Sequence, residues 1–257
     1  MRSVTLPGLG THTLDQTLRR LIVAWQHPTS RLISAVGALE QHDDGYAFSY
    51  LRLAEQVEDF RAFIGFPDLY RRYESTQLFP LFRQRVMDPK RPDYIRYLET
   101  LGLGEDAAPM EILGRSSGVR PGDAILLFPE PTVDPSGSTH CTFLVHGMRH
   151  MAKFGVLSRL STLRPGDQLR LKPDPTNPVN NQALIITSTD DHPLGWVPDV
   201  LLSYVHTVLA TSPLTLTVER ANTASVPWHL RLCVKLTGQV SPGYRPFNGP
   251  DWQPLSG

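Results

Sequence analysis

Cysteine is scarce in this chain of 257 residues, which contains only Cys141 and Cys233. Two cysteines cannot form the disulfide framework of a small secreted domain, so we expect a reducing, cytoplasmic location. No run of about 18 apolar residues is present that could cross a membrane as a helix, which predicts no membrane partner. Residues 1–8 also lack the apolar stretch of a secretory signal.

An excess of charge of one sign is absent as well, because 25 Lys and Arg balance 25 Asp and Glu. A protein that coats nucleic acid without selectivity is usually far more basic. The balance hides a local stripe of cations in the second half, interrupted only by Asp167: Arg149, Lys153, Arg159, Arg164, Arg170 and Lys172. This stripe is either a solvated face or a surface for a polyanion.

Signatures of known enzyme classes are missing too. The chain has no Gly-x-Ser-x-Gly nucleophile elbow, no phosphate-binding Gly-x-x-x-x-Gly-Lys-Ser/Thr loop and no protein-kinase motif. Gly8-Leu9-Gly10 lacks the third glycine of a dinucleotide fingerprint. We therefore expect no catalytic residue, no cofactor and no enzymatic activity.

A metal site is also not expected. His146 and His150 are four residues apart and close to Cys141, but that spacing brings two imidazoles together only on a helix. The segment instead has the pattern of a strand that leads into a turn, and no Cys-x-x-Cys pair accompanies it.

The first half alternates between strand and helix patterns. Extended, β-branched or aromatic runs at 21–25, 31–39 and 46–50 predict three antiparallel strands, with a turn at Asp43-Asp44-Gly45. Apolar spacing predicts helices over 93–101 and 108–114. Residues 1–128 are therefore predicted to form a mixed domain of a β-meander and helices.

A change of composition follows. Prolines, Ser and Gly across 129–139 predict a linker between domains. Beyond it, six strand-like segments and a helical one at 200–210 predict a second, β-rich domain over 140–240. Residues 241–257 contain four prolines and predict a loose tail. The fold class that we expect is α+β.

The candidate site of the second half centres on a loop with the sequence Asp174-Pro175-Thr176-Asn177-Pro178-Val179-Asn180-Asn181. Two prolines fix φ, and the Asp and Asn side chains can bond neighbouring amides, so the loop should be rigid. A rigid polar loop suits recognition, although it can equally be a self-satisfied turn.

Four motifs together resemble the HIRAN domain of Swi/Snf-type DNA-remodelling helicases and of small bacterial proteins. The resemblance covers residues 141–210 and extends less clearly to residue 237. The four motifs are Phe143-Leu144-Val145-His146-Gly147-Met148-Arg149-His150, Leu163-Arg164-Pro165-Gly166-Asp167, the loop above, and Leu194-Gly195-Trp196-Val197-Pro198. The resemblance implies a small OB-like β-barrel with one or two helices. It also implies binding of the 3′ hydroxyl end of single-stranded DNA, without catalysis.

The resemblance assigns roles residue by residue. Arg149 stands at the position of the family's pocket arginine, and His150 at that of a tyrosine that stacks on the terminal base. Asn177 matches the loop asparagine, while Asn180 replaces an aspartate that accepts from the 3′ hydroxyl. Trp196 follows the family's glycine and can stack on a base.

The chain departs from this family at three of these positions. Histidine at 150 is a smaller stacking platform, Asn180 offers an amide in place of a charge, and Val179 replaces an aromatic residue. The residues themselves also favour nucleic acid, since Lys153 can bind phosphate and Phe154 can stack on a base.

The first half has a separate resemblance over residues 20–120, to the N-terminal subdomain of HipA-type toxin kinases. It rests on Val36-Gly37-Ala38-Leu39, Asp44-Gly45-Tyr46-Ala47-Phe48-Ser49-Tyr50, Ser75 with Leu78-Phe79-Pro80-Leu81-Phe82, and Leu101-Gly102-Leu103. That subdomain is not catalytic and sits against a kinase body, which this sequence does not contain.

The favoured hypothesis is a non-catalytic protein that binds single-stranded DNA, at its 3′ end, in DNA repair or genome maintenance. Its site residues would be Arg149, His150, Lys153, Asn177, Asn180 and Trp196. An adaptor or regulator that docks on a kinase, or on a helicase, is the alternative. An enzyme such as a nuclease is a third, but it needs a carboxylate cluster that the sequence does not suggest.

Overall fold

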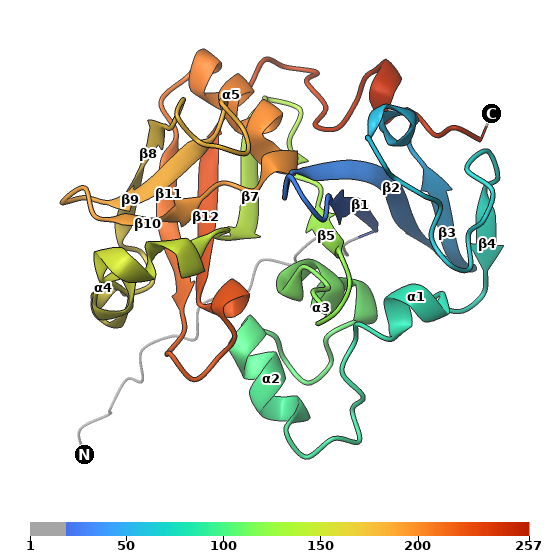
Figure 1. The fold of residues 1–257 in the computed structure, drawn as a ribbon, viewed down its shortest axis with the longest axis horizontal. Coiled ribbons are helices and arrows are strands. Elements are labelled where there is room, and N and C mark those ends of the chain that lie inside the picture. The colour runs from blue at the N-terminus through green and yellow to red at the C-terminus, as the bar shows by residue number, and fades with distance from the viewer. Residues whose placement is uncertain (1–18, 257) are drawn as a thin grey trace, which may run out of the picture.

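The computed structural model describes residues 19–256, so residues 1–18, which include the segments 1–8 and 8–10 considered above, lie outside the described part. Two antiparallel sheets dominate the fold, one in each half of the chain (Figure 1). Few and short helices accompany them, which confirms the expected α+β class.

The first half is built on a five-stranded sheet with the order β4-β3-β2-β1-β5. Both faces of its central strands are covered, since residues 21–24 of β1 are all fully buried, and Phe48 and Tyr50 of β3 are fully buried on one face. The strands and helices of this half are β1 (Arg20–Gln26), β2 (Ile33–His42), β3 (Gly45–Tyr50), η1 (Arg52–Gln56), β4 (Tyr73–Ser75), α1 (Pro80–Arg83), α2 (Tyr94–Leu101), α3 (Pro109–Ser116) and β5 (Ile125–Pro129).

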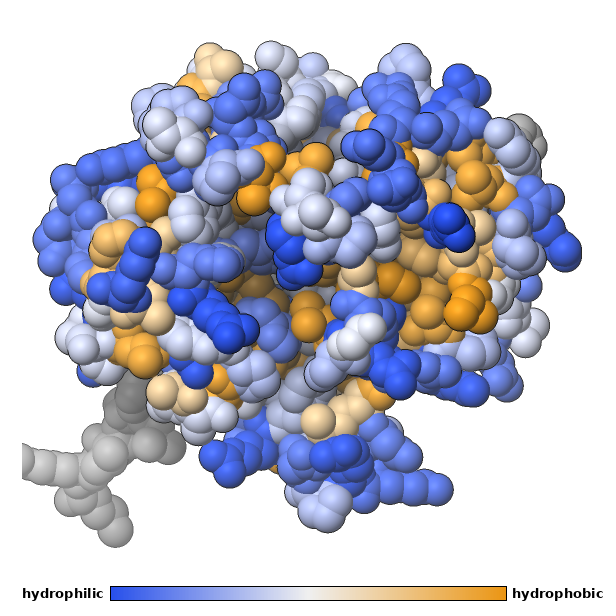
Figure 2. All heavy atoms as spheres, in the orientation of Figure 1, coloured by the Kyte–Doolittle hydropathy of each residue, from blue (hydrophilic) through white to orange (hydrophobic). Residues whose placement is uncertain are grey.

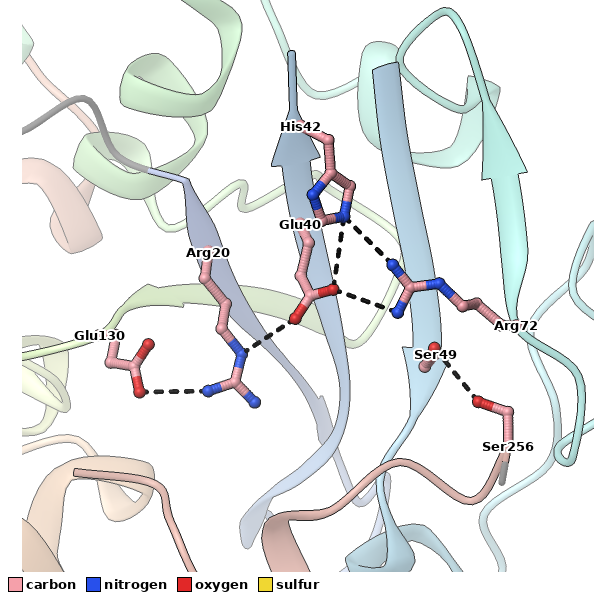
Figure 3. A network of polar contacts seen from close by, with 7 residues as sticks. All are labelled: Arg20, Glu40, His42, Ser49, Arg72, Glu130 and Ser256. Atoms are coloured by element: carbon pink, nitrogen blue, oxygen red, sulfur yellow. Dashed lines mark hydrogen bonds and ion pairs between the residues drawn. The ribbon is translucent and has the colours of Figure 1, made fainter. Parts of the chain in front are cut away.

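A charged network runs across the strands of this sheet (Figure 3). Arg20 lies 3.1 Å from Glu130 and 3.6 Å from Glu40, and Glu40 also contacts Arg72 at 3.4 Å and His42 at 3.7 Å. Burial raises the pKa of Glu130, against the opposing effect of Arg20. The two arginines and two glutamates of this network therefore offset one another.

The second half forms a seven-stranded antiparallel sheet with the order β10-β9-β8-β11-β12-β7-β6. Its elements are β6 (Thr132–Val133), β7 (Ser138–Leu144), η2 (Met148–Phe154), α4 (Val156–Thr162), β8 (Gln168–Pro173), β9 (Leu184–Ser188), β10 (Pro193–Trp196), η3 (Asp199–Leu201), α5 (Leu202–Thr211), β11 (Thr215–Ala221), η4 (Trp228–Leu230) and β12 (Leu232–Gln239), followed by η5 (Pro250–Trp252).

This sheet is not a closed barrel, and in that respect it differs from the OB-like β-barrel that the resemblance to the HIRAN domain implied. The chain just beyond β7 returns to β10 only at an isolated bridge, in which the backbones of His146 and Trp196 exchange hydrogen bonds of 3.0 and 2.9 Å. One bridge brings the two ends of the sheet together without continuing the ladder, so both edges stay open.

The segment 129–139 is ordered structure and not the linker that we predicted. Pro129 pairs with Leu21 in the first sheet, and Thr132 pairs with His140 in the second. Between them the Asp134 carboxylate accepts backbone hydrogen bonds from Ser136 and Ser138. The Asp134 carboxylate thus caps a tight turn that joins β6 to β7 within the second sheet, and only residues 130 and 131 connect the two sheets.

The C-terminal residues also differ from the expected loose tail. They run back across the first half, where Leu51 pairs with Pro254 and the Leu255 amide donates to the Tyr50 carbonyl at 2.8 Å. Phe247 is buried and its ring lies 4.6 Å from that of Trp252. Prolines are tolerated in this C-terminal segment because a segment at the edge of a sheet needs few backbone N–H donors.

One of the hydrophobic clusters crosses the boundary between the halves, while another lies within the first half alone. Ile22, Ala24 and Phe128 of the first half lie in the same buried cluster as Cys141, Leu184 and Val234 of the second half. Among the described residues, no helix is long and apolar enough to cross a membrane.

Candidate nucleic-acid interface

The element η2 carries three of the predicted site residues on the surface. Gly147 starts it with a positive φ of 69°, and a buried Met148 and Met151 anchor it to the core. The remaining positions, Arg149, His150, Lys153 and Phe154, point outward because a tight helical turn cannot bury all of its faces; all four are exposed.

The cationic stripe divides into paired and unpaired members. The Arg159 guanidinium contacts Asp190, while Asp191 lies 3.4 Å from Arg170 and 2.8 Å from Lys172. The hydrogen bond from Lys172 holds the pKa of Asp191 below its usual range. Three of the six predicted cations therefore pair with the two acids of the β9–β10 turn.

Arg149 and Lys153 have no such partner. Within residues 19–256, neither side chain makes an ion pair or a hydrogen bond. The Lys153 ammonium instead lies 5.0 Å from the ring centre of Phe154, whose side chain is 49% exposed. Arg164 donates to the carbonyls of Ser161 and Leu163 and keeps its charge without an acid.

Trp196 joins η2 to the loop at 174–182. Its indole nitrogen donates to the Asp174 carboxylate at 2.9 Å, and one part of its ring lies against Gly147, where an added Cβ would be 2.4 Å away. The ring is thus packed on its Gly147 side, and its polar edge holds the loop. Trp196 positions the site more than it offers a free stacking face.

The loop is rigid, as its sequence predicted, because its polar side chains bond one another. Asp174 accepts from Thr176 and Asn177 at 3.2 Å, and the Asn177 oxygen accepts the amides of Val179 and Asn180. Burial alone would raise the pKa of Asp174, but the hydrogen bonds from Trp196, Asn177 and Thr176 outweigh it and lower the pKa.

Asn180 faces a different neighbour. Its amide nitrogen donates to Asp199 at 3.1 Å, and its oxygen accepts the Gln182 amide at 3.0 Å. The other Asp199 oxygen accepts the amide of Ile33 at 3.4 Å. Burial raises the pKa of Asp199. Sequence reasoning did not place Asp199 at the site, since its partners lie 19 and 166 residues away.

His146 and His150 do not form a metal site with Cys141 in this arrangement. His146 lies against the Phe128 ring, whereas His150 is exposed on η2 and Cys141 is buried. Over the described residues, no group of three or more His, Cys, Asp or Glu side chains is arranged to hold a metal ion.

Comparison with known proteins gives two likenesses of fold. No protein-family model and no curated protein matches the sequence. A solved Lactobacillus plantarum protein matches 40% of this chain and 100% of its own, with 20% identity and a TM-score of 0.32. The HIRAN domain of human HLTF matches 41% of this chain and 78% of its own, with 13% identity and a TM-score of 0.28. We base no inference on similarities of this size. The resemblance of residues 20–120 to HipA-type kinases stays a prediction.

Proposed function

We propose that the surface formed by η2 and the loop at 174–182 binds single-stranded nucleic acid, with a preference for the 3′ end of DNA. The observation that carries this proposal is the concentration of unpaired cations on η2, next to an exposed aromatic ring. The proposal assigns no catalytic step to the protein.

The charges support contact with a phosphate backbone. Arg149 and Lys153 lie four residues apart on one short element, and their charge is not offset by any described acid. A chain of phosphates gains most from such cations, because binding releases condensed counterions. The paired Arg159, Arg170 and Lys172 would add less, since they already contact Asp190 and Asp191, the second of which Arg170 and Lys172 share.

Exposed rings support contact with bases. Phe154 offers an open face beside the Lys153 ammonium, and His150 is exposed on the same element. Stacking of a base on an aromatic side chain contributes about 1–3 kcal/mol and needs little sequence selectivity. In duplex DNA the faces of the bases are already stacked on one another, so aromatic side chains and cations together favour a single strand.

Preference for a 3′ end is supported by the loop. The Asn180 oxygen accepts one hydrogen bond, from Gln182, and a carbonyl oxygen has two lone pairs. A terminal hydroxyl could donate to the second. Because the acceptor is neutral, we expect a preference smaller than a carboxylate would provide, by about 1–2 kcal/mol.

Fluorescence anisotropy of a labelled single strand tests the proposal. Binding should weaken as salt rises from about 50 to 200 mM, and Arg149→Ala or Lys153→Ala should each reduce the salt slope by about 0.7. Arg61→Ala and Lys90→Ala are matched controls, because both cations are exposed in the first half. A strand with a 3′ phosphate should bind more weakly than one with a 3′ hydroxyl.

Two outcomes would overturn the proposal. Wild-type protein that does not bind the strand at low salt would remove it altogether. Binding that responds equally to Arg149→Ala and to Arg61→Ala would show that the attraction is general and not located on η2.

A further inference from the structure

We infer that the first half of the chain supplies the opposite wall of the same nucleic-acid site, through Arg31 in the turn between β1 and β2. This inference rests on the proposed function and extends it to a residue that lies more than a hundred positions before η2 in the sequence.

Direct contacts place the β1–β2 turn beside the candidate site. The Ile33 amide, two residues after Arg31, donates to Asp199 at 3.4 Å, and Asp199 accepts from Asn180 of the loop at 3.1 Å. In Figure 1 the β1–β2 turn reaches from the first sheet toward the second half. A chain of two hydrogen bonds thus links the turn to the loop.

The turn itself is rigid. The His27 Nδ1 atom accepts the amides of Thr29 and Ser30 at 3.1 and 3.0 Å, and the Arg31 amide donates to the His27 carbonyl at 3.0 Å. The Gln26 side chain donates to the Arg31 carbonyl at 3.1 Å. Five residues therefore fix the backbone from which the Arg31 side chain projects.

Arg31 is an unfavourable residue for this backbone position. Its φ is 66°, a value that Gly and Asn adopt easily and a long side chain does not. Residues held in such conformations are often found at binding sites, where the side chain is needed. The Arg31 side chain is exposed, and within residues 19–256 it forms no ion pair or hydrogen bond.

The space between the two walls is open. Figure 2 shows that this face of the molecule is hollowed between the two halves, with hydrophilic side chains on both sides of the hollow. Two acids lie beside the turn, Asp59 at 3.5 Å from His27 and Asp199 at 3.4 Å from the Ile33 amide, and neither pairs with the Arg31 side chain. Unpaired cations on two separate elements, Arg31 on the turn and Arg149 and Lys153 on η2, suit one ligand class above others, a flexible polyanion such as a single strand.

Three substitutions at Arg31 separate the charge from the fold. Arg31→Ala and Arg31→Gly should each weaken binding of the single strand about five- to tenfold at about 50 mM salt and lower the salt slope by about 0.7. Arg31→Lys should stay within about threefold of wild type, because the charge remains. Arg31→Gly should unfold in urea no earlier than wild type, since glycine accepts the positive φ. Arg61→Ala is the control cation.

The outcomes distinguish this inference from the proposed function. The inference is wrong, and the proposed function stands, if the wild type binds the strand, Arg149→Ala weakens this binding, and Arg31→Ala has the same affinity as the control Arg61→Ala. If wild type does not bind, both fail. If Arg31→Gly binds as wild type does, the arginine serves the turn alone, and the inference is again overturned.

Discussion

His146 is a titratable residue that the fold keeps neutral. Its ring centre lies 5.7 Å from that of Phe128, and its backbone forms the bridge to Trp196. Burial, together with the nearby His229, lowers the pKa of His146 to about 4. In the unfolded chain the same imidazole would titrate near pH 6.5. The native state therefore binds fewer protons than the unfolded state over the interval between these values.

This difference predicts a loss of stability in mild acid. A lowered histidine pKa means that the unfolded state gains a proton first as the pH falls, so the free energy of unfolding decreases below about pH 6.5. We expect a decrease of about 1–2 kcal/mol between about pH 6.5 and 5, where each unit can contribute up to about 1.4 kcal/mol. Urea denaturation at a series of pH values measures it.

The variant His146→Phe provides the comparison. It keeps a ring against Phe128 and removes the titrating group, so its stability should depend less on pH over the same interval. His229, whose pKa burial also lowers, should keep part of the dependence. Identical pH profiles for the variant and the wild type would show that His146 does not cause the effect.

Single residues also show what sequence reasoning could reach. The types of residue at the site were predictable, since Arg149, Lys153 and the loop asparagines stand out in the sequence. Their partners were not, because neutralisation depends on distant contacts: Arg159 contacts Asp190, which follows 31 positions later. Spacing along the chain therefore suggested one continuous cationic stripe, where the fold leaves only part of it unpaired.

At the scale of elements, Gly147 determines where η2 begins and what it rests on. Its φ is 69°, its carbonyl accepts the His150 amide at 2.9 Å, and a Cβ would collide with Trp196 at 2.4 Å. Glycine is needed here for two separate reasons, the backbone conformation and the close approach of the ring.

Gly147→Ala should therefore destabilise the protein more than conformational cost alone explains. Gly243→Ala is the matched control, since Gly243 has a φ of 84° and open space around it. We expect Gly147→Ala to reduce the free energy of unfolding by about 1–3 kcal/mol more than the control, through overpacking against Trp196. It should also weaken single-strand binding, because η2 must move away from β10.

Denaturant midpoints and anisotropy measure the two effects. Equal destabilisation by the two alanines would mean that the ring can shift freely, and η2 would then not depend on Trp196 for its position.

Elements with strong periodicity were predictable from the sequence. The strands expected at 21–25 and 46–50 and the helix expected at 93–101 correspond to β1, β3 and α2. The short β6 of two residues was not, because its extended form depends on pairing with β7 and on the Asp134 turn, and not on local propensity. The proline content of 129–139 thus indicated a linker where long-range pairing makes a sheet.

At the scale of the whole molecule, the two halves share one core. Ile22 of β1 is fully buried, and it lies in the same hydrophobic cluster as Cys141 of β7 and Val234 of β12 in the second sheet. The sequence suggested separate domains because its composition changes near residue 130. Local composition indicates where turns occur, whereas a hydrophobic cluster with residues from both halves depends on how the two sheets pack together.

A shared core predicts that the halves unfold together. Cys141 is a buried free thiol of the second half, and burial raises its pKa to about 12, so only opened molecules should react with a thiol reagent. Ile22→Val, a change in the first half, should reduce stability by about 0.5–1.5 kcal/mol. The same loss of free energy raises the population of opened molecules, so the labelling rate of Cys141 should increase by about two- to tenfold.

The exposed Ile95 of α2 supplies the control, because Ile95→Val removes the same methylene from a side chain that is 43% exposed. Its labelling rate should equal that of the wild type. Domains that open independently would give the opposite pattern: Ile22→Val would destabilise the first half in circular dichroism and leave the labelling of Cys141 unchanged. Coupled labelling would also support the inference from Arg31, since a site with walls from both halves needs them held in one arrangement.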